Sequence, residues 1–302
     1  MRGFLFAVTY YLLSVGYVLV SLPFLALPGR GPVRVIIRSY TRAMNLNLLV
    51  FGGISKEVRG RDNLPKGAFV IAPKHQSWGD GYLIYPEVKN LAFVTGDHLE
   101  RFPLVGGILR KLGAIVIDTC GGGDRKAESL REGMETASQE GRRVLIYPEG
   151  HLAPIDYHFR YKPGVWHMAE AMGVPAVPVA TNIGLFWRQQ ETRKTSGRAV
   201  IEFLEPIPPG LPKDEFMARL TDVIETRTAE LIAEVRGGPP IRATLIPDPP
   251  RAWKPNQHLT IRPHSQRPDL KAGQIYYLYS IIIYCYSIFS QVIPGAKSGC
   301  PL

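Results

Sequence analysis

The chain has 302 residues, of which 45% are hydrophobic, so it can bury a sizeable core and is not an intrinsically disordered protein. Its 36 Lys and Arg residues outnumber its 26 Asp and Glu residues, which suits an anionic partner such as nucleic acid, a phospholipid surface or a phosphorylated substrate. Its three cysteines are too few and too scattered for a disulfide framework or a zinc site, which favours a reducing compartment.

An uncharged apolar run opens the chain. It extends from Gly3 to Leu27, roughly the length that spans a bilayer as a helix, and it predicts membrane attachment. A cleaved signal peptide is one alternative, although ALPGR is a poor cleavage site. Pro23 leaves another alternative open, in which the run breaks into a helix and a re-entrant piece that enters only one leaflet.

Arginines gather after this run, whereas only Arg2 precedes it. By the positive-inside rule we expect the main domain to face the cytoplasm, with the protein at the cytoplasmic (inner) membrane. Apolar residues mix with these arginines from Pro32 to Leu49, which predicts a helix that lies on the membrane surface or packs on the core. The arginines are Arg30, Arg34, Arg38 and Arg42.

Short β-prone runs then alternate with helical patterns. Helices are predicted over residues 125–140 and 214–235, where apolar residues recur at helical spacing. The alternation predicts an α/β fold with a mixed central sheet flanked by helices, after an N-terminal membrane-anchoring helical segment over residues 1–50. Strands are predicted at residues 69–73, 91–95, 113–117, 143–148, 175–181 and 198–204.

The composition changes beyond Arg236. Residues 237–257 are rich in Gly and Pro and show no sustained period, so the main domain, residues 51–236, is expected to end there. Residues 237–302 are expected to form a linker and an apolar tail. Residues 275–294 are uncharged and about long enough to span a membrane, so a second membrane helix is one interpretation. The alternatives are a β-prone or poorly ordered tail, and a tail read from an altered frame.

A histidine and an aspartate follow the first predicted strand. The segment KHQSWGD places Asp80 five residues after His75, so a turn into a helix would fold the carboxylate back toward the imidazole. A carboxylate on one ring nitrogen fixes the tautomer and leaves the other nitrogen free to take a proton from a hydroxyl. The spacing alone also fits a loop contact or a helix cap.

KHQSWGD is followed in order by LGAIVID (112–118), YPEGH (147–151) and GVPAVPVATN (173–182). These four segments resemble those of the glycerolipid acyltransferases, typified by 1-acylglycerol-3-phosphate acyltransferase. The resemblance covers about residues 55–235, plus the anchor, and implies that residues 51–236 are an acyltransferase domain. It also implies that His75 is the general base and that Asp80 orients it. KHQSWGD is similar to the H-x4-D motif, LGAIVID (112–118) to G-x-x-x-[IV]-[DR]-R, YPEGH (147–151) to P-E-G-T-R, and GVPAVPVATN (173–182) to a Val/Pro-rich strand.

Two departures concern the acceptor. Thr119 stands where the family usually has Arg, and His151 and Leu152 replace the usual Thr-Arg pair. The resemblance implies that such arginines hold the acceptor phosphate, for which the planar guanidinium is well suited. Nearby basic residues could substitute for them or could be solvated surface charges. These residues are Arg125, Lys126, Arg160 and Lys162.

Glu149 and Gly150 end a predicted strand, where an α/β sheet usually binds its substrate. We expect Glu149 either to accept hydrogen bonds from glycerol hydroxyls or to organise its own loop. Residues 121–123 are all glycine but lack the Gly-Lys-Ser/Thr ending of a phosphate-binding loop, so they predict a flexible loop. The histidines offer no convincing ligand set, so no metal is expected.

Together with the resemblance, these residues predict an O-acyltransferase of phospholipid biosynthesis. It would move a fatty acyl group from acyl-CoA or acyl carrier protein to the sn-2 hydroxyl of 1-acylglycerol-3-phosphate, giving phosphatidate. The expected partners are a phospholipid membrane, the lysophospholipid acceptor and the thioester donor, with no nucleic acid and no bound cofactor. The alternatives are another lysolipid or an acylated amino-acid acceptor, and a non-catalytic membrane-surface binding protein. A hydrolase using Ser77 is disfavoured because no G-x-S-x-G elbow is present.

Overall fold

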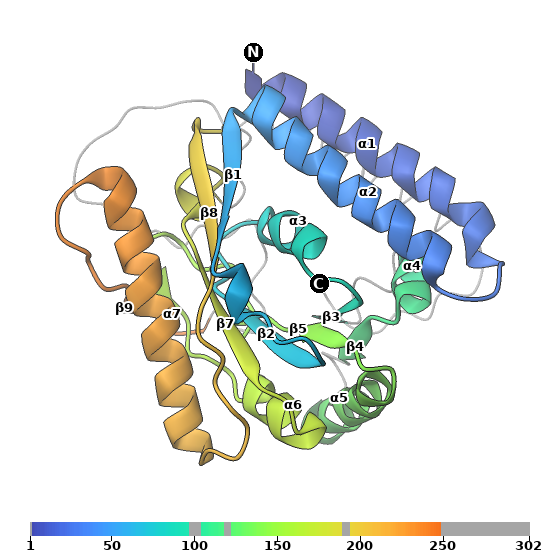
Figure 1. Cartoon of the computed structure of the whole chain (residues 1–302). Helices are drawn as coiled ribbons and strands as arrows, with labels where there is room; N and C mark the ends of the chain where they lie inside the picture. The colour runs from blue at the N-terminus through green and yellow to red at the C-terminus, as the bar shows by residue number, and fades with distance from the viewer. Residues whose placement is uncertain (1, 97–103, 118–121, 189–193, 249–302) are drawn as a thin grey trace. The chain divides into compact units, whose positions relative to one another are not determined.

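The computed structural model describes residues 2–96, 104–117, 122–188 and 194–248 (Figure 1). Residues Met1–Asp248 group into one compact unit. The predicted membrane segment at 275–294 lies outside the described residues, as does Thr119.

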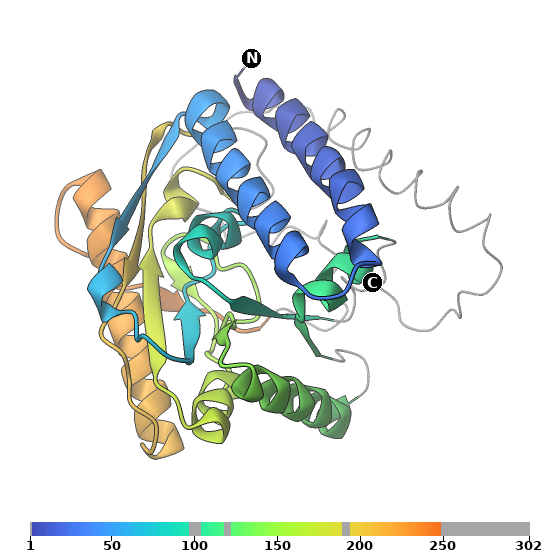
Figure 2. The same cartoon turned by 45° about the vertical axis from the view of Figure 1, so that its right-hand side comes forward.

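Two long helices, α1 (Arg2–Leu25) and α2 (Gly31–Asn47), form an antiparallel hairpin and lie side by side in Figures 1 and 2. Helix α1 is long and apolar enough to cross a membrane. Pro23 lies in its last turn, so it does not break the helix. A π-helical turn at Leu48–Gly52 ends the hairpin. Side-chain hydrogen bonds join the helices at three levels: Thr9–Asn47 at 2.6 Å, Ser14–Tyr40 at 2.9 Å and Tyr17–Ser39 at 2.8 Å.

A seven-stranded sheet forms the centre of the fold, in the order β1-β8-β7-β2-β5-β3-β4. The five strands from β7 to β4 are parallel, β8 is antiparallel to β7, and β1 is parallel to β8. The predicted mixed central sheet is therefore confirmed. The strands are β1 (Ile54–Arg59), β2 (Phe69–Pro73), β3 (Leu91–Gly96), β4 (Ile115–Ile117), β5 (Arg143–Leu145), β7 (Ala176–Thr181) and β8 (Gly197–Phe203).

Helices cover both faces of this sheet. Strand β2 is wholly buried, and its side chains alternate between two cores: Phe69 and Ile71 in one, Val70 and Ala72 in the other. The first core also holds residues of the hairpin and of α3 (Asp80–Ile84), and the second holds residues of three longer helices. Those helices are α5 (Gly122–Gln139), α6 (Gly164–Met172) and α7 (Lys213–Arg236), while α4 (Val105–Leu112) packs beside the hairpin.

The described fold continues past the end of α7. Strand β9 (Thr244–Leu245) pairs with β6 (Tyr157–His158), which belongs to the loop that follows β5. Arg236 also forms two bonds to the Asp156 carboxylate, at 2.7 and 3.0 Å. The segment after Arg236 therefore returns to the loop that follows β5.

Candidate active site

The carboxyl ends of three neighbouring parallel strands bring the candidate residues together. Strands β2, β5 and β7 lie side by side, so their carboxyl ends share one edge of the sheet. His75 follows β2, and Glu149 follows β5. Asp80 is the first residue of α3, which starts from the loop after β2.

The His75 imidazole contacts the Asp80 carboxylate. Nδ1 of His75 lies 2.9 Å from Oδ2 of Asp80, and the same oxygen accepts bonds from the backbone amides of Gln76 (2.9 Å) and Ser77 (3.0 Å). Because the ionised carboxylate only accepts, it favours the tautomer with hydrogen on Nδ1 and a free lone pair on Nε2. The fold-back predicted from the five-residue spacing is therefore observed.

The turn into α3 needs glycine at position 79. A Cβ there would lie 2.6 Å from a side-chain carbon of Ile183 and 2.7 Å from one of Trp187. Glycine therefore lets the chain pass close to the 3-10 turn at Ile183–Leu185 and to Trp187. Gly79 thereby allows Asp80 to reach the imidazole.

The rest of His75 is held by the segment after β5. Its ring stacks on Tyr147 with centroids 3.8 Å apart and an interplanar angle of 19°. Its amide donates to Oε1 of Glu149 at 3.2 Å, and its carbonyl accepts from the amide of Ala153 at 2.7 Å. Burial, and then the negative charge of Asp80, raises the pKa of Tyr147 well above its usual value, so its phenol stays protonated. The imidazole side chain is 20% exposed, so part of it is accessible from outside the protein.

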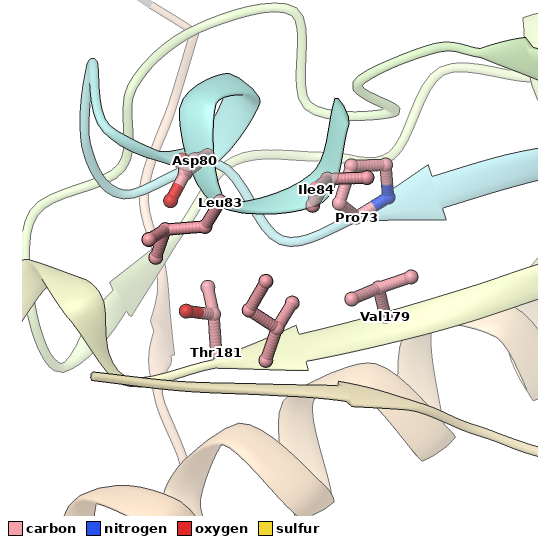
Figure 3. A pocket seen from close by; sticks show the side chains of 7 residues that line it. Pro73, Asp80, Leu83, Ile84, Val179 and Thr181 are labelled. Carbon is pink, nitrogen blue, oxygen red and sulfur yellow. The ribbon is translucent and has the colours of Figure 1, made fainter. Parts of the chain in front are cut away.

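A small cavity lies beneath Asp80 (Figure 3). It has no room for a water molecule, so it does not hold a substrate. Oδ1 of Asp80 is buried and has no hydrogen-bond partner among the described residues. An apolar floor without water strengthens the interaction of this carboxylate with the imidazole. The cavity is lined by Pro73, Asp80, Leu83, Ile84, Val179, Thr181 and Ile201.

Glu149 is fully buried, and both of its oxygens are engaged within the protein. Besides the His75 amide, it accepts bonds from Nζ of Lys74 (3.2 Å) and the amide of Phe159 (2.9 Å). Burial raises its pKa, and the positive charge of Lys74 opposes this rise. These contacts match the alternative in which Glu149 organises its loop rather than binding glycerol hydroxyls.

Basic side chains lie beside this buried cluster. Lys162 is exposed, and its Nζ would be 2.8 Å from a Cβ at Gly150, whose φ is +69°. Burial, followed by the charges of Lys162 and His75, lowers the pKa of His151, whereas Asp248 opposes this shift. Lys162, His151 and His75 therefore lie close enough for their charges to interact.

For the other basic candidates, Arg160, Arg125 and Lys126, the structure gives no contact with His75 or Asp80 among the described atoms. Arg160 is exposed, and like Lys162 it forms no ion pair with a carboxylate in the described part of the chain. Arg125 lies in the first part of α5, but its side chain is outside the described atoms, as is that of Lys126. The structure therefore brings together His75, Asp80, Glu149, Gly150 and Lys162.

Residues 55–182 match the protein family whose description is Acyltransferase. This part of the chain is therefore similar to an acyltransferase domain. The matched segment contains His75, Asp80, Glu149 and Lys162, whereas the helical hairpin and α7 lie outside it.

Several curated proteins and a solved structure are similar to this chain. The 1-acyl-sn-glycerol-3-phosphate acyltransferase of Pseudomonas aeruginosa is 30% identical over 171 residues, which are 57% of this chain and 66% of that protein, just under two thirds of its length. The alpha form from Ovis aries is 28% identical over 233 residues, covering 72% of this chain and 77% of that protein. A similar solved structure is the crystal structure of the 1-acyl-sn-glycerophosphate acyltransferase PlsC from Thermotoga maritima, with a TM-score of 0.64 and 22% sequence identity. The match covers 79% of this chain and 100% of that chain, so the two proteins share the same fold.

The described residues bear on two other kinds of site, a serine nucleophile and a metal site. Ser77 is fully buried, and its Oγ accepts a bond from the Gly79 amide at 3.0 Å, so it is not an exposed nucleophile. No group of three or more His, Cys, Asp or Glu residues could hold a metal ion within the described ranges.

Sequence reasoning missed three residues that contact the site directly or through a partner: Lys74, Tyr147 and Glu225. Tyr147 stacks on the imidazole, although nothing in YPEGH distinguishes it from a packing aromatic. Lys74 directly follows an apolar strand, and Glu225 lies on the buried face of α7 with Thr228 and Ile232. A charged residue at an otherwise apolar, buried position indicates that a buried partner of opposite charge lies nearby, because a charge is rarely buried without one.

Proposed function

We propose that this protein is a membrane-associated 1-acyl-sn-glycerol-3-phosphate O-acyltransferase that produces phosphatidate. The observation that carries the proposal is the 2.9 Å contact between His75 Nδ1 and Asp80 Oδ2, with part of the imidazole exposed. The printed names of the relatives from Pseudomonas aeruginosa and Ovis aries support lysophosphatidate as the acceptor.

In the proposed reaction, Nε2 of His75 removes the proton from the sn-2 hydroxyl of the acceptor. The hydroxyl oxygen forms a bond to the thioester carbonyl carbon of acyl-CoA or acyl carrier protein. The tetrahedral intermediate then loses the C–S bond, and the leaving thiolate takes the proton from the imidazolium. Asp80 stabilises that imidazolium, as a carboxylate does in the serine hydrolase triad. Because the lipid supplies the nucleophile, no covalent acyl-enzyme forms.

Lys162 is the proposed contact for the acceptor phosphate. It is exposed, has no carboxylate partner among the described residues, and interacts electrostatically with His151, which in turn interacts with His75. An ammonium binds phosphate as a point charge, without the bidentate geometry of the family's usual arginines. This difference keeps a second acceptor class, another lysolipid or an acylated amino-acid lipid, as a candidate.

The hairpin of α1 and α2 is the proposed membrane contact. Phe6 of α1 is 3% exposed and meets Trp187 edge-on, with ring centroids 5.3 Å apart, and the hydroxyl of Tyr10 lies 2.9 Å from that of Tyr82 in α3. A helix crossing the bilayer would have to leave these contacts, so we propose that the hairpin enters one leaflet, with the domain on the cytoplasmic side. Its exposed apolar side chains include Phe4, Leu12, Val15, Leu19, Val20, Val35 and Leu46.

The test is an assay of the purified protein on phospholipid vesicles, with several lysolipids and an acylated amino-acid lipid offered against both thioester donors. Lipid products are identified by mass spectrometry, and His75→Ala protein provides the blank. We expect lysophosphatidate to have the highest kcat/KM and to give phosphatidate. Preferred transfer to a different lipid would overturn the acceptor. Vesicle binding without transfer from either donor would overturn the enzyme assignment in favour of a binding protein.

A further inference from the structure

A buried lysine joins the loop of His75 to the helix α7. The Lys74 side chain is fully buried and directly precedes His75. Its ammonium has three acceptors: Glu225 Oε1 at 2.8 Å, the Tyr157 carbonyl at 3.1 Å and Glu149 Oε2 at 3.2 Å. Because an ammonium has three protons, all of its donors are used.

The bonds continue from this lysine to the backbone of His75. Glu149 uses its other oxygen to accept from the His75 amide. On the far side, Oε1 of Glu225 also accepts a bond from the Tyr161 hydroxyl at 2.7 Å. An uninterrupted series of hydrogen bonds therefore runs from α7 through Lys74 and Glu149 to the residue that carries the imidazole.

This network is poorly arranged for stability alone. One buried lysine faces two buried carboxylates, and Oε2 of Glu225 has no hydrogen-bond partner in the described part of the chain. Desolvating such charges often costs more than their attraction returns, and apolar side chains of similar size could fill the space. A role in positioning explains why charged side chains occupy this site, since charge-assisted hydrogen bonds specify a single geometry.

We propose that Lys74 and Glu225 are positioning residues for acyl transfer, which hold Glu149 against the His75 amide and so set the place of the imidazole. The inference rests on the proposed role of His75 as the base. It adds to the machinery a residue of α7, outside the segment that matches the acyltransferase family. Displacement of a reacting group by about 1 Å can cost on the order of 10²-fold in rate, so this loop needs firm support.

The experiment compares Lys74→Met and Glu225→Leu with the conservative Glu225→Gln in the full-length protein on vesicles. Glu225→Gln keeps an acceptor oxygen for Lys74 and Tyr161, whereas Glu225→Leu removes it. We expect the first two variants to lower kcat about 10²-fold while KM for both substrates stays within about twofold, and Glu225→Gln to recover most of kcat. Thr228→Val is the control, because Thr228 lies on the same buried face of α7, and its Oγ1 has no hydrogen-bond partner among the described residues.

Nitrogen NMR of the histidine rings gives a readout that a merely structural role would not change. The His75 resonances, assigned by their loss in His75→Ala, should shift or broaden in Glu225→Leu and remain in place in Thr228→Val. Wild-type kcat per folded molecule together with an unchanged His75 signal in Glu225→Leu would overturn the inference. If that variant does not fold, Tyr161→Phe removes one bond to Glu225, and wild-type values of kcat and of the His75 signal there would overturn it equally.

The two proposals fail in different ways. Activity retained by His75→Ala removes the base and therefore the proposed function, whatever Lys74 does. An inactive His75→Ala combined with fully active Lys74→Met and Glu225→Leu removes the positioning role alone.

Discussion

The loop after β2 and the loop after β5 both reach the same edge of the sheet, but their polar groups are satisfied to different degrees. Around His75 and Asp80, most polar groups are bonded within the protein, and the buried atoms without a partner among the described residues are Oδ1 of Asp80 and Oε1 of Gln76. Around Lys162, the cationic groups are exposed and have no carboxylate partner in the described ranges. We therefore expect the bonds around His75 to hold one geometry, and the exposed cations around Lys162 to receive an anion. Substitutions of the residues that hold His75 should therefore lower kcat, and substitutions of the exposed cations around Lys162 should raise KM.

Removal of the imidazole should have the largest effect. We expect His75→Ala to lower kcat by up to about 10⁴-fold, because general base catalysis contributes that much at most. The folding temperature should change little, since this side chain is partly exposed. Acyl transfer to lysophosphatidate is measured on vesicles, with His167→Ala, a substitution at an exposed histidine of α6, as the control. More than about a tenth of the wild-type kcat in His75→Ala would contradict the division between the loops.

Asp80→Asn should have a smaller effect. The amides of Gln76 and Ser77 both donate to the Oδ2 position, so they favour the asparagine oxygen there and preserve the Nδ1–H tautomer of His75. Only the negative charge is then lost, and bonds to charged groups contribute about 1.5–3 kcal/mol, so kcat should fall roughly 10- to 100-fold. The asparagine nitrogen would lie unpaired against the apolar cavity, which should lower the melting temperature.

Kinetics and nitrogen NMR of His75 together check the Asp80→Asn prediction. A retained Nδ1–H signal with the moderate loss of kcat is the expected result. A switch of the proton to Nε2 would show that the backbone amides of Gln76 and Ser77 do not control the orientation of residue 80.

Lys162→Ala tests the exposed cations in the loop after β5. We expect KM for lysophosphatidate to rise about tenfold with little change in kcat, because a charge-assisted contact to phosphate is lost. The effect should shrink as salt is added. Lys66→Ala is the matched control, since Lys66 is also exposed but precedes β2 and so lies toward the opposite edge of the sheet. An unchanged KM in Lys162→Ala would leave the acceptor phosphate without its proposed contact.

The smallest expected effect concerns the pH dependence of stability at His151. Burial, Lys162 and His75 lower the pKa of His151, so the unfolded state binds more protons once the pH falls below about 6.5. The contribution of neutral His151 to the free energy of unfolding is therefore present above the pKa of His151 in the unfolded state, and it is lost as the pH falls through its pKa in the folded state. We expect His151→Asn to reduce the drop in melting temperature between about pH 7.5 and pH 5.5 by roughly 1–2 °C. His167→Asn should leave that drop unchanged; an equal change in both variants would rule out a specific effect.

Much of the fold could be predicted because its signals are local. All six predicted strands were found, since each contains several consecutive apolar or β-branched residues that mark a buried strand. Strand β1 was missed because Ile54–Arg59 contains three charged residues, and its pairing with β8 joins segments far apart in the sequence. The short helices α4 and α6 were also missed, because eight or nine residues give too few turns for a clear period.

The sequence by itself predicted the contact of His75 with Asp80 once the family resemblance was added to the spacing, because five residues and a helix start restrict where the carboxylate can lie. It also determined the mixed α/β fold and the apolar N-terminal helix. Only the tertiary structure decided that Glu149 points inward, and that Lys74 bonds to Glu225 across 151 positions. Such partners are chosen by how α7 packs on the sheet, and the low polarity of the interior then makes their pairing obligatory.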